Sequence, residues 1–238
     1  RAHGLMERAR RGGGPELQAA VMRGRMDPEL AGALRREAAH LGAQLAVRSS
    51  AVDEDGAGAS HAGQFETVLC VRPGDETERA VLRCWASAFS GRVSAYRGRL
   101  RGGARALPEM AVVVQAMVAP RCAGVMFTTS PLTGTWREMT VEAAWGLGEA
   151  VVSGRVVPDF YQVRRPRRLP GPVQPRPLER VLARVRLVVE RDEIRPQTRQ
   201  WVRGASGPEE VAVPPARVEA PKLRHAELLR LCRLGLRV

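Results

Sequence analysis

Apolar positions recur at helical spacing in three stretches of the chain. The first, residues 26–42 (MDPELAGALRREAAHLG), begins with Asp27 and Pro28, which suit the N-cap and first turn of a helix. Its predicted apolar face consists of Leu30, Leu34, Ala38 and Leu41. A second helix is predicted over residues 75–100, with a face made of Val81, Trp85, Ala88 and Tyr96. Residues 221–238 predict a third, amphipathic helix.

Short apolar runs elsewhere predict strands instead of helices. They lie at residues 45–50, 66–71, 110–118, 123–130, 138–145, 160–165 and 186–194. Helices and strands alternate without a regular βαβ order, so the predicted fold class is α+β, or mixed α/β. The proline- and arginine-rich stretch near 164–180 predicts an exposed loop.

A long polar segment follows the first predicted strand. In AVRSSAVDEDGAGASHAGQFET, residues 46–67, a lone arginine ends an apolar run, and residues rich in serine, acid and glycine follow it. A loop of this length in a compact domain is usually a lid or a binding loop. We therefore expect residues 52–63 to be more mobile than the neighbouring strands when no ligand is bound.

Composition narrows the class of protein. With 238 residues and 44% hydrophobic content, the chain is long enough for one large or two small domains. It contains no apolar run long enough for a membrane helix and no signal peptide at its start, so a cytoplasmic location is expected. The four cysteines stand far apart and predict buried apolar residues, with neither a disulfide framework nor a zinc site.

The net charge of +13 raises the possibility of nucleic-acid binding. However, the cations are almost all arginine, with Lys222 the single lysine, and they are spread along the chain. Aromatic residues, on which single-stranded nucleic acids stack, make up only 4%. An arginine-rich nucleic-acid binder is therefore kept only as an alternative.

Common phosphate-binding and nucleophile motifs are absent. No lysine follows a glycine-rich loop as a P-loop requires, and GLGEAV has Val151 where the third glycine of a dinucleotide fingerprint belongs. A GxSxG nucleophile elbow is also missing.

Four ordered motifs carry a more specific signal. AVRSSAVDEDGAGASHAGQFET, VVVQAMV, AGVMFTTSPLTG and AAWGLGEAVVSGRVVPDFYQV resemble successive motifs of the ATP-binding domain of the phosphoenolpyruvate synthase, pyruvate phosphate dikinase and rifampin phosphotransferase family. The resemblance implies an ATP-grasp fold, with a first lobe at 27–117, a second at 118–238 and a poorly defined segment at 1–26. It also implies transfer of a phosphate from ATP to a histidine on a separate domain, and then to an acceptor.

Arg48 is the first candidate site residue. At the end of a strand its guanidinium can present two donors to phosphate oxygens, or it can pair with Asp53, Glu54 or Asp55 on the surface. The resemblance implies a catalytic contact between Arg48 and the ATP phosphates.

Gly63 and Thr67 are two further candidates for the ATP contact. Glycine lets backbone amides approach an anion and threonine adds a hydroxyl donor, although the pattern alone also fits a turn followed by an edge strand. The resemblance makes both residues ATP contacts.

Gln115 interrupts an apolar strand, and periodicity allows it to face either a ligand or solvent. The resemblance places it beside the adenine, with Met117 and Val118 as apolar neighbours of the base. Three residues are secondary candidates: Gln64, Glu142 and Glu149. The two glutamates are expected to accept backbone amides near Gly146 or Gly148.

His61 lies in GASHAG, which superficially resembles a phosphate-carrying histidine motif. The residues that follow it match the ATP loop instead, so a catalytic role for His61 is not expected.

The sequence departs from the family pattern at both ends. It lacks the glycine-rich segment with an ATP-binding lysine, and the later acid, glutamine and arginine that hold metal and phosphates. The Mg²⁺ ligands are therefore expected outside this chain. Phosphoryl transfer depends on metal ions and charged side chains that position the phosphates. The isolated chain is therefore predicted to be inactive, whereas the parent protein is predicted to be an active phosphotransferase. A truncated scaffold that binds nucleotide weakly, or not at all, is the other alternative.

Overall fold

The computed structural model describes residues 14–51, 66–89, 110–131, 133–165 and 186–237. They form two compact units. Unit 1 contains the chain up to Val118 together with Gly204–Gly207, and unit 2 contains Ala119–Arg203 and Pro208–Val238. The combination of helices with antiparallel sheets confirms the predicted mixed α and β class.

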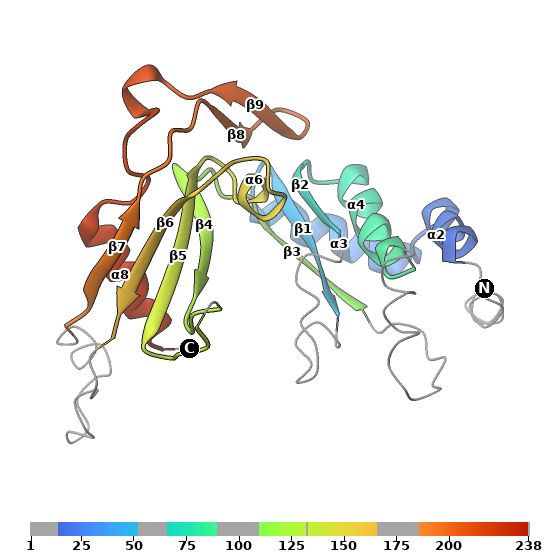
Figure 1. Cartoon of the computed structure of the whole chain (residues 1–238). Coiled ribbons are helices and arrows are strands. Elements are labelled where there is room, and N and C mark those ends of the chain that lie inside the picture. The colour runs from blue at the N-terminus through green and yellow to red at the C-terminus, as the bar shows by residue number, and fades with distance from the viewer. Residues whose placement is uncertain (1–13, 52–65, 90–109, 132, 166–185, 238) are drawn as a thin grey trace. The chain divides into compact units, whose positions relative to one another are not determined.

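Unit 1 is built on a three-stranded antiparallel sheet with the order β2-β1-β3 (Figure 1). Its strands are β1 (Leu45–Ala51), β2 (Thr67–Val71) and β3 (Met110–Ala116). Its helices are α2 (Gly14–Arg23), α3 (Pro28–Leu41) and α4 (Asp75–Ser87). The Asp27 carboxylate accepts the backbone N–H groups of Glu29 and Leu30, as expected of an N-cap residue.

One face of this sheet forms the core of unit 1. Leu45 and Val47 of β1 are fully buried against α3 and α4, where Ala38, Val81 and Cys84 lie. Because side chains alternate along a strand, the residues between them point to the opposite face. We call that opposite face the outer face of the sheet.

Two details of the predicted helices are wrong. In α3 the predicted face is confirmed at Leu34 and Ala38, but Leu30 and Leu41 are 49% and 40% exposed, and Ala31 is buried with Ala38. Successive helix residues turn by about 100°, so these alanines lie about 80–100° around the axis from Leu30. Burial in α3 is therefore centred on the two alanines, with Leu34 partly buried against the core. In the second case α4 ends at Ser87 and a turn follows at residues 88–89, so the helix predicted over residues 75–100 is not continuous; its remaining residues, 90–100, lie outside the described part.

Unit 2 is built on a four-stranded antiparallel sheet with the order β4-β5-β6-β7. These strands are β4 (Cys122–Phe127), β5 (Glu138–Trp145), β6 (Asp159–Arg164) and β7 (Val188–Glu193). The helix α8 (His225–Gly235) lies across one face, where Leu228 and Cys232 pack on Met139 and Val141 (Figure 1). Sequence analysis missed the short α6 (Glu149–Val152), the hairpin of β8 (Arg199–Arg203) and β9 (Pro208–Ala212), and the 3-10 helix η1 (Pro215–Arg217).

Two glycines in unit 2 allow close backbone contacts. A Cβ atom on Gly124 of β4 would lie 1.8 Å from the carbonyl oxygen of Glu142 on β5. Gly146 has a φ of 84°, and a Cβ there would lie 2.2 Å from the carbonyl oxygen of Trp201. No other residue type fits either position without moving backbone.

Several sequence predictions concern residues outside the described part. These include the polar loop at 52–63 and nearly all of the proline- and arginine-rich stretch at 164–180. Within the described residues, no helix combines the length and apolar character needed to cross a membrane.

Candidate functional site

Three of the predicted site residues share the outer face of the unit 1 sheet. Arg48 of β1 stands directly opposite Thr67 of β2 on one side and Val113 of β3 on the other. Gln115 is two residues along β3 from Val113, opposite Ala46. Because side chains at every second position share a face, Arg48, Thr67 and Gln115 project from the same surface.

The polar groups of these three side chains have no partner among the described residues. All three residues are exposed, and none of their side chains makes a hydrogen bond or ion pair with any described residue. Three other arginines of unit 1, Arg35, Arg72 and Arg83, pair with glutamates, whereas Arg36 and Arg79 resemble Arg48 in making no hydrogen bond or ion pair with the described residues. The alternative partners suggested for Arg48, at positions 53–55, lie outside the described part.

The predicted neighbours of the base continue from the same strand. β3 ends at Ala116, and the N–H of Met117 donates to the carbonyl oxygen of Gln44 at 2.9 Å. Met117 is half-buried, whereas Val118 is 68% exposed. The Val118 side chain is therefore accessible to an apolar ligand surface, although a single exposed apolar residue is also common on protein surfaces.

Sequence analysis missed two residues of the outer face. Ser50 lies two positions beyond Arg48 on β1 and is exposed, and Val113 is 45% exposed beside Arg48. The signal was available, because strict alternation from Arg48 and from Gln115 selects both positions. It was overlooked because the motif directed attention to Arg48 and Gln115 alone.

The two predicted glutamates belong to unit 2. Glu142 lies on β5 between Val125 and Phe160, and its carboxylate has no partner among the described residues. Glu149 begins α6, and its nearest cation is Arg155 at 3.8 Å.

The expected hydrogen bonds from backbone amides to these glutamates are not formed in the loop between β5 and α6. The N–H of Gly146 donates to the carbonyl oxygen of Arg121 at 3.1 Å, and the N–H of Leu147 donates to that of Trp201 at 2.7 Å. Main-chain carbonyls therefore hold the loop. Gly63, Gln64 and His61 lie outside the described residues.

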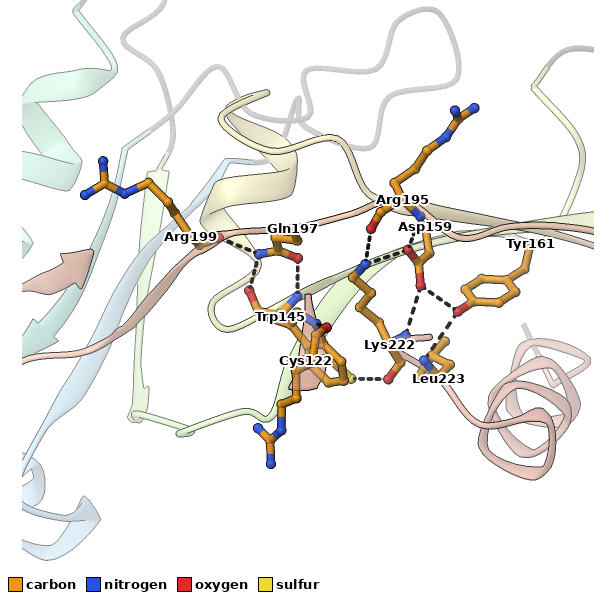
Figure 2. A network of polar contacts seen from close by, with 10 residues as sticks. Cys122, Trp145, Asp159, Tyr161, Arg195, Gln197, Arg199, Lys222 and Leu223 are labelled. Atoms are coloured by element: carbon orange, nitrogen blue, oxygen red, sulfur yellow. Dashed lines mark hydrogen bonds and ion pairs between the residues drawn. The ribbon is translucent and has the colours of Figure 1, made fainter. Parts of the chain in front are cut away.

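A second polar cluster lies inside unit 2, around the buried pair of Asp159 and Lys222 (Figure 2). Lys222 Nζ lies 2.8 Å from Asp159 Oδ1 and also donates to the carbonyl oxygen of Arg195. The other donors to the carboxylate are the N–H groups of Lys222 and Arg195 and the hydroxyl of Tyr161, each at 2.9 Å. Both charged side chains are fully buried, and the carboxylate accepts four hydrogen bonds. Such a saturated cluster stabilises a fold and leaves no group for a ligand.

An apolar hollow of about 330 Å³ adjoins β4, β5 and α8 in unit 2. Its lining includes Gly124, Met126 and Leu231, and its one charged residue is Glu142. A carboxylate repels phosphate groups, so the hollow is a poor site for the phosphates of a nucleotide.

Two of the described thiols are unreactive, and the described residues contain no metal cluster. Burial raises the pKa of both Cys84 and Cys232 to about 11, so these thiols remain protonated at neutral pH. The described part contains no group of three or more histidine, cysteine, aspartate or glutamate side chains that could hold a metal ion. The outer face of the unit 1 sheet is therefore the best candidate site.

The family follows from comparison with known proteins. The model of the family described as "Pyruvate phosphate dikinase, AMP/ATP-binding domain" matches residues 7–238. The chain belongs to this family. The suspected relationship to phosphoenolpyruvate synthase, pyruvate phosphate dikinase and rifampin phosphotransferase is thereby confirmed.

Similarity to individual proteins supports the same family assignment. A rifampicin phosphotransferase of Streptomyces sviceus is 39% identical over 212 residues, covering 88% of this chain and 22% of its own length. The prodigiosin synthesizing transferase PigC of Serratia marcescens is 39% identical over 194 residues, covering 82% of this chain and 19% of its own. A phosphoenolpyruvate synthase of Pyrococcus furiosus is 47% identical over 121 residues, covering 51% of this chain and 15% of its own. The chain thus spans about a fifth or less of these relatives.

Proposed function

We propose that this chain binds ATP on the outer face of the β2-β1-β3 sheet. The observation that carries the proposal is a group of three exposed polar side chains on one face that have no partner within the described part of the chain, Arg48, Thr67 and Gln115. Membership of an AMP/ATP-binding family names the class of ligand.

Each of the three residues has chemistry that suits one part of the nucleotide. The Arg48 guanidinium offers paired donors to phosphate oxygens, and the Thr67 hydroxyl offers one more. The Gln115 amide has both a donor and an acceptor, as recognition of an adenine edge requires. Diagonal neighbours on adjacent strands are about 7–8 Å apart, so one nucleotide can reach from Arg48 to Gln115.

The larger reaction in this proposal belongs to the parent protein. The two units are the lobes of an ATP-grasp fold, and a phosphate of ATP passes to a histidine on a separate carrier domain and then to an acceptor. The names of the relatives include a rifampicin phosphotransferase and a phosphoenolpyruvate synthase, which span two acceptor classes. Ligands for Mg²⁺ and the acceptor site lie beyond these residues, in line with the small part of each relative that the chain covers.

A backbone NMR titration of the full chain with ATP tests the proposal. Amide signals of β1, β2 and β3 should shift in a saturable way, while those of α8 in unit 2 stay unchanged. Saturable shifts confined to unit 2, or none at all, would contradict ATP binding on this face. A scaffold that does not bind nucleotide predicts no saturable shifts at all.

A parallel titration with a single-stranded oligonucleotide tests the nucleic-acid alternative. An arginine-rich nucleic-acid binder should respond to a single-stranded oligonucleotide, lose that response steeply with added salt and ignore ATP. If the face binds ATP as proposed, the chain should respond to ATP and not to the oligonucleotide.

A further inference from the structure

An exposed valine lies in the middle of the polar outer face of unit 1. Val113 is 45% exposed on β3, directly opposite Arg48 and two residues from Gln115. A β-branched residue in a strand is common, but here it separates the groups proposed for the phosphates and for the base.

The strand register fixes what lies between Arg48 and Gln115. These residues occupy opposite corners of a four-residue patch, and the other two corners are Val113 and Ala46. Ala46 is only 3% exposed, so Val113 presents nearly all of the apolar surface within the patch. A ligand that runs from Arg48 to Gln115 must cross the Val113 side chain.

We propose that Val113 is a specificity-determining residue that contacts the sugar of the nucleotide and limits the space above the sheet. This inference rests on the proposed function, because it presumes that a nucleotide bridges Arg48 and Gln115. The small side chain leaves room for the sugar, and its methyl groups replace water against the apolar edge of the ring. It takes no part in holding the phosphates, which lie toward Arg48 and Thr67.

Two probes separate this role from that of Arg48. ATP carries both the nucleoside and the phosphates, whereas inorganic tripolyphosphate carries only the phosphates. Val113→Phe should weaken binding of ATP to the full chain by at least about tenfold, because the ring occupies the space of the sugar. Binding of tripolyphosphate should remain within about twofold of the unmodified chain. Arg48→Ala should weaken both.

Val188→Phe is the matched control, because Val188 is an equally exposed valine, at 46%, on a strand of unit 2. It should leave both affinities unchanged. Val113→Thr keeps the size of the side chain but adds a hydroxyl, and should weaken ATP binding by only about two- to fivefold. Unfolding temperatures of all variants verify that each is folded.

Three results would overturn the inference. ATP affinity that is unchanged in folded Val113→Phe removes the residue from the site while leaving the proposed function intact. Equal loss of ATP and tripolyphosphate binding means that the substitution disturbs the sheet and not the nucleoside contact. Absence of ATP binding to the unmodified chain refutes the proposed function, and the role of Val113 with it.

Discussion

Unit 1 and unit 2 each contain a group of polar side chains, but only the group in unit 2 has hydrogen-bond partners within the described part of the protein. In unit 2 the fully buried Asp159 and Lys222 use their polar groups within the protein. In unit 1, Arg48, Thr67 and Gln115 are exposed and have no side-chain partner among the described residues.

This difference separates a structural cluster from a binding site. A buried ion pair stabilises the fold only when every group is matched, and removing one member leaves an uncompensated charge. Exposed polar groups contribute little to stability, and they remain available to a ligand. Substitutions in the buried cluster of unit 2 should therefore lower the stability of the fold. Substitutions in the exposed group of unit 1 should instead weaken ligand binding.

The largest expected effect on stability is that of Asp159→Ala. It leaves the Lys222 ammonium buried without a counter-ion, which should lower the free energy of unfolding by about 3–5 kcal/mol. Arg48→Ala, at an exposed side chain, should change it by no more than about 0.5 kcal/mol. Urea denaturation of both variants measures the contrast.

Replacing both members of the pair provides the control. Asp159→Leu combined with Lys222→Met removes both charges, and should recover a large part of the stability lost in Asp159→Ala. If Asp159→Ala were as stable as the unmodified chain, the ion pair would not have the structural role assigned to it.

A smaller contrast comes from adding one methyl group to a glycine in each unit. Gly124→Ala places a Cβ 1.8 Å from the Glu142 carbonyl oxygen, so backbone must move and stability should fall by about 3 kcal/mol. Gly32→Ala lies inside α3, where the nearest atom is the flexible Arg36 side chain at 3.5 Å. It should raise stability by up to about 1 kcal/mol. Similar melting temperatures for the two variants would refute the close contact between β4 and β5.

The seven predicted strands correspond to β1–β7 because their apolar runs are short, whereas the more polar β8 and β9 were missed. The same reasoning was right only in part for α3: Ala38 is buried and Leu34 packs on the core as predicted, but Leu30 and Leu41 are exposed and Ala31 is buried instead. Side-chain size determines how closely a helix approaches its neighbours, and hydrophobic periodicity does not include that information.

For the candidate site, motif resemblance selected Arg48, Thr67 and Gln115, and the strand register shows that they share a face. No property of the sequence alone could reveal that register. Lys222 illustrates the converse: the sequence showed a single lysine, but its pairing with Asp159 joins positions 63 residues apart. Such pairings depend on the tertiary fold and leave no local pattern.

A pH-dependent effect in unit 2 is the smallest we expect. Hydrogen bonds from the side chain and the backbone N–H of Arg224 lower the pKa of Glu227 from 4.5 to about 2. A carboxylate with a lowered folded-state pKa stabilises the fold above its unfolded pKa, and that contribution is lost as pH falls. The melting temperature should therefore decrease as pH falls from about 5 toward 2, and part of this slope should disappear in Glu227→Gln. An identical slope in the variant would show that other carboxylates account for it.

The affinity of the full chain for ATP, measured by calorimetry beside the unfolding temperature, tests the central claim most directly. Arg48→Ala should weaken ATP binding by at least about tenfold with no loss of stability, because a charge-assisted contact is worth about 1.5–3 kcal/mol. Arg48→Lys should recover only part, since lysine keeps the charge but lacks the paired donors. Arg79→Ala is the matched control, an exposed arginine on α4 across the sheet from the site, and should bind as the unmodified chain does. Unchanged ATP affinity in a folded Arg48→Ala chain would contradict the account, because it would remove the phosphate contact on which the proposed site depends.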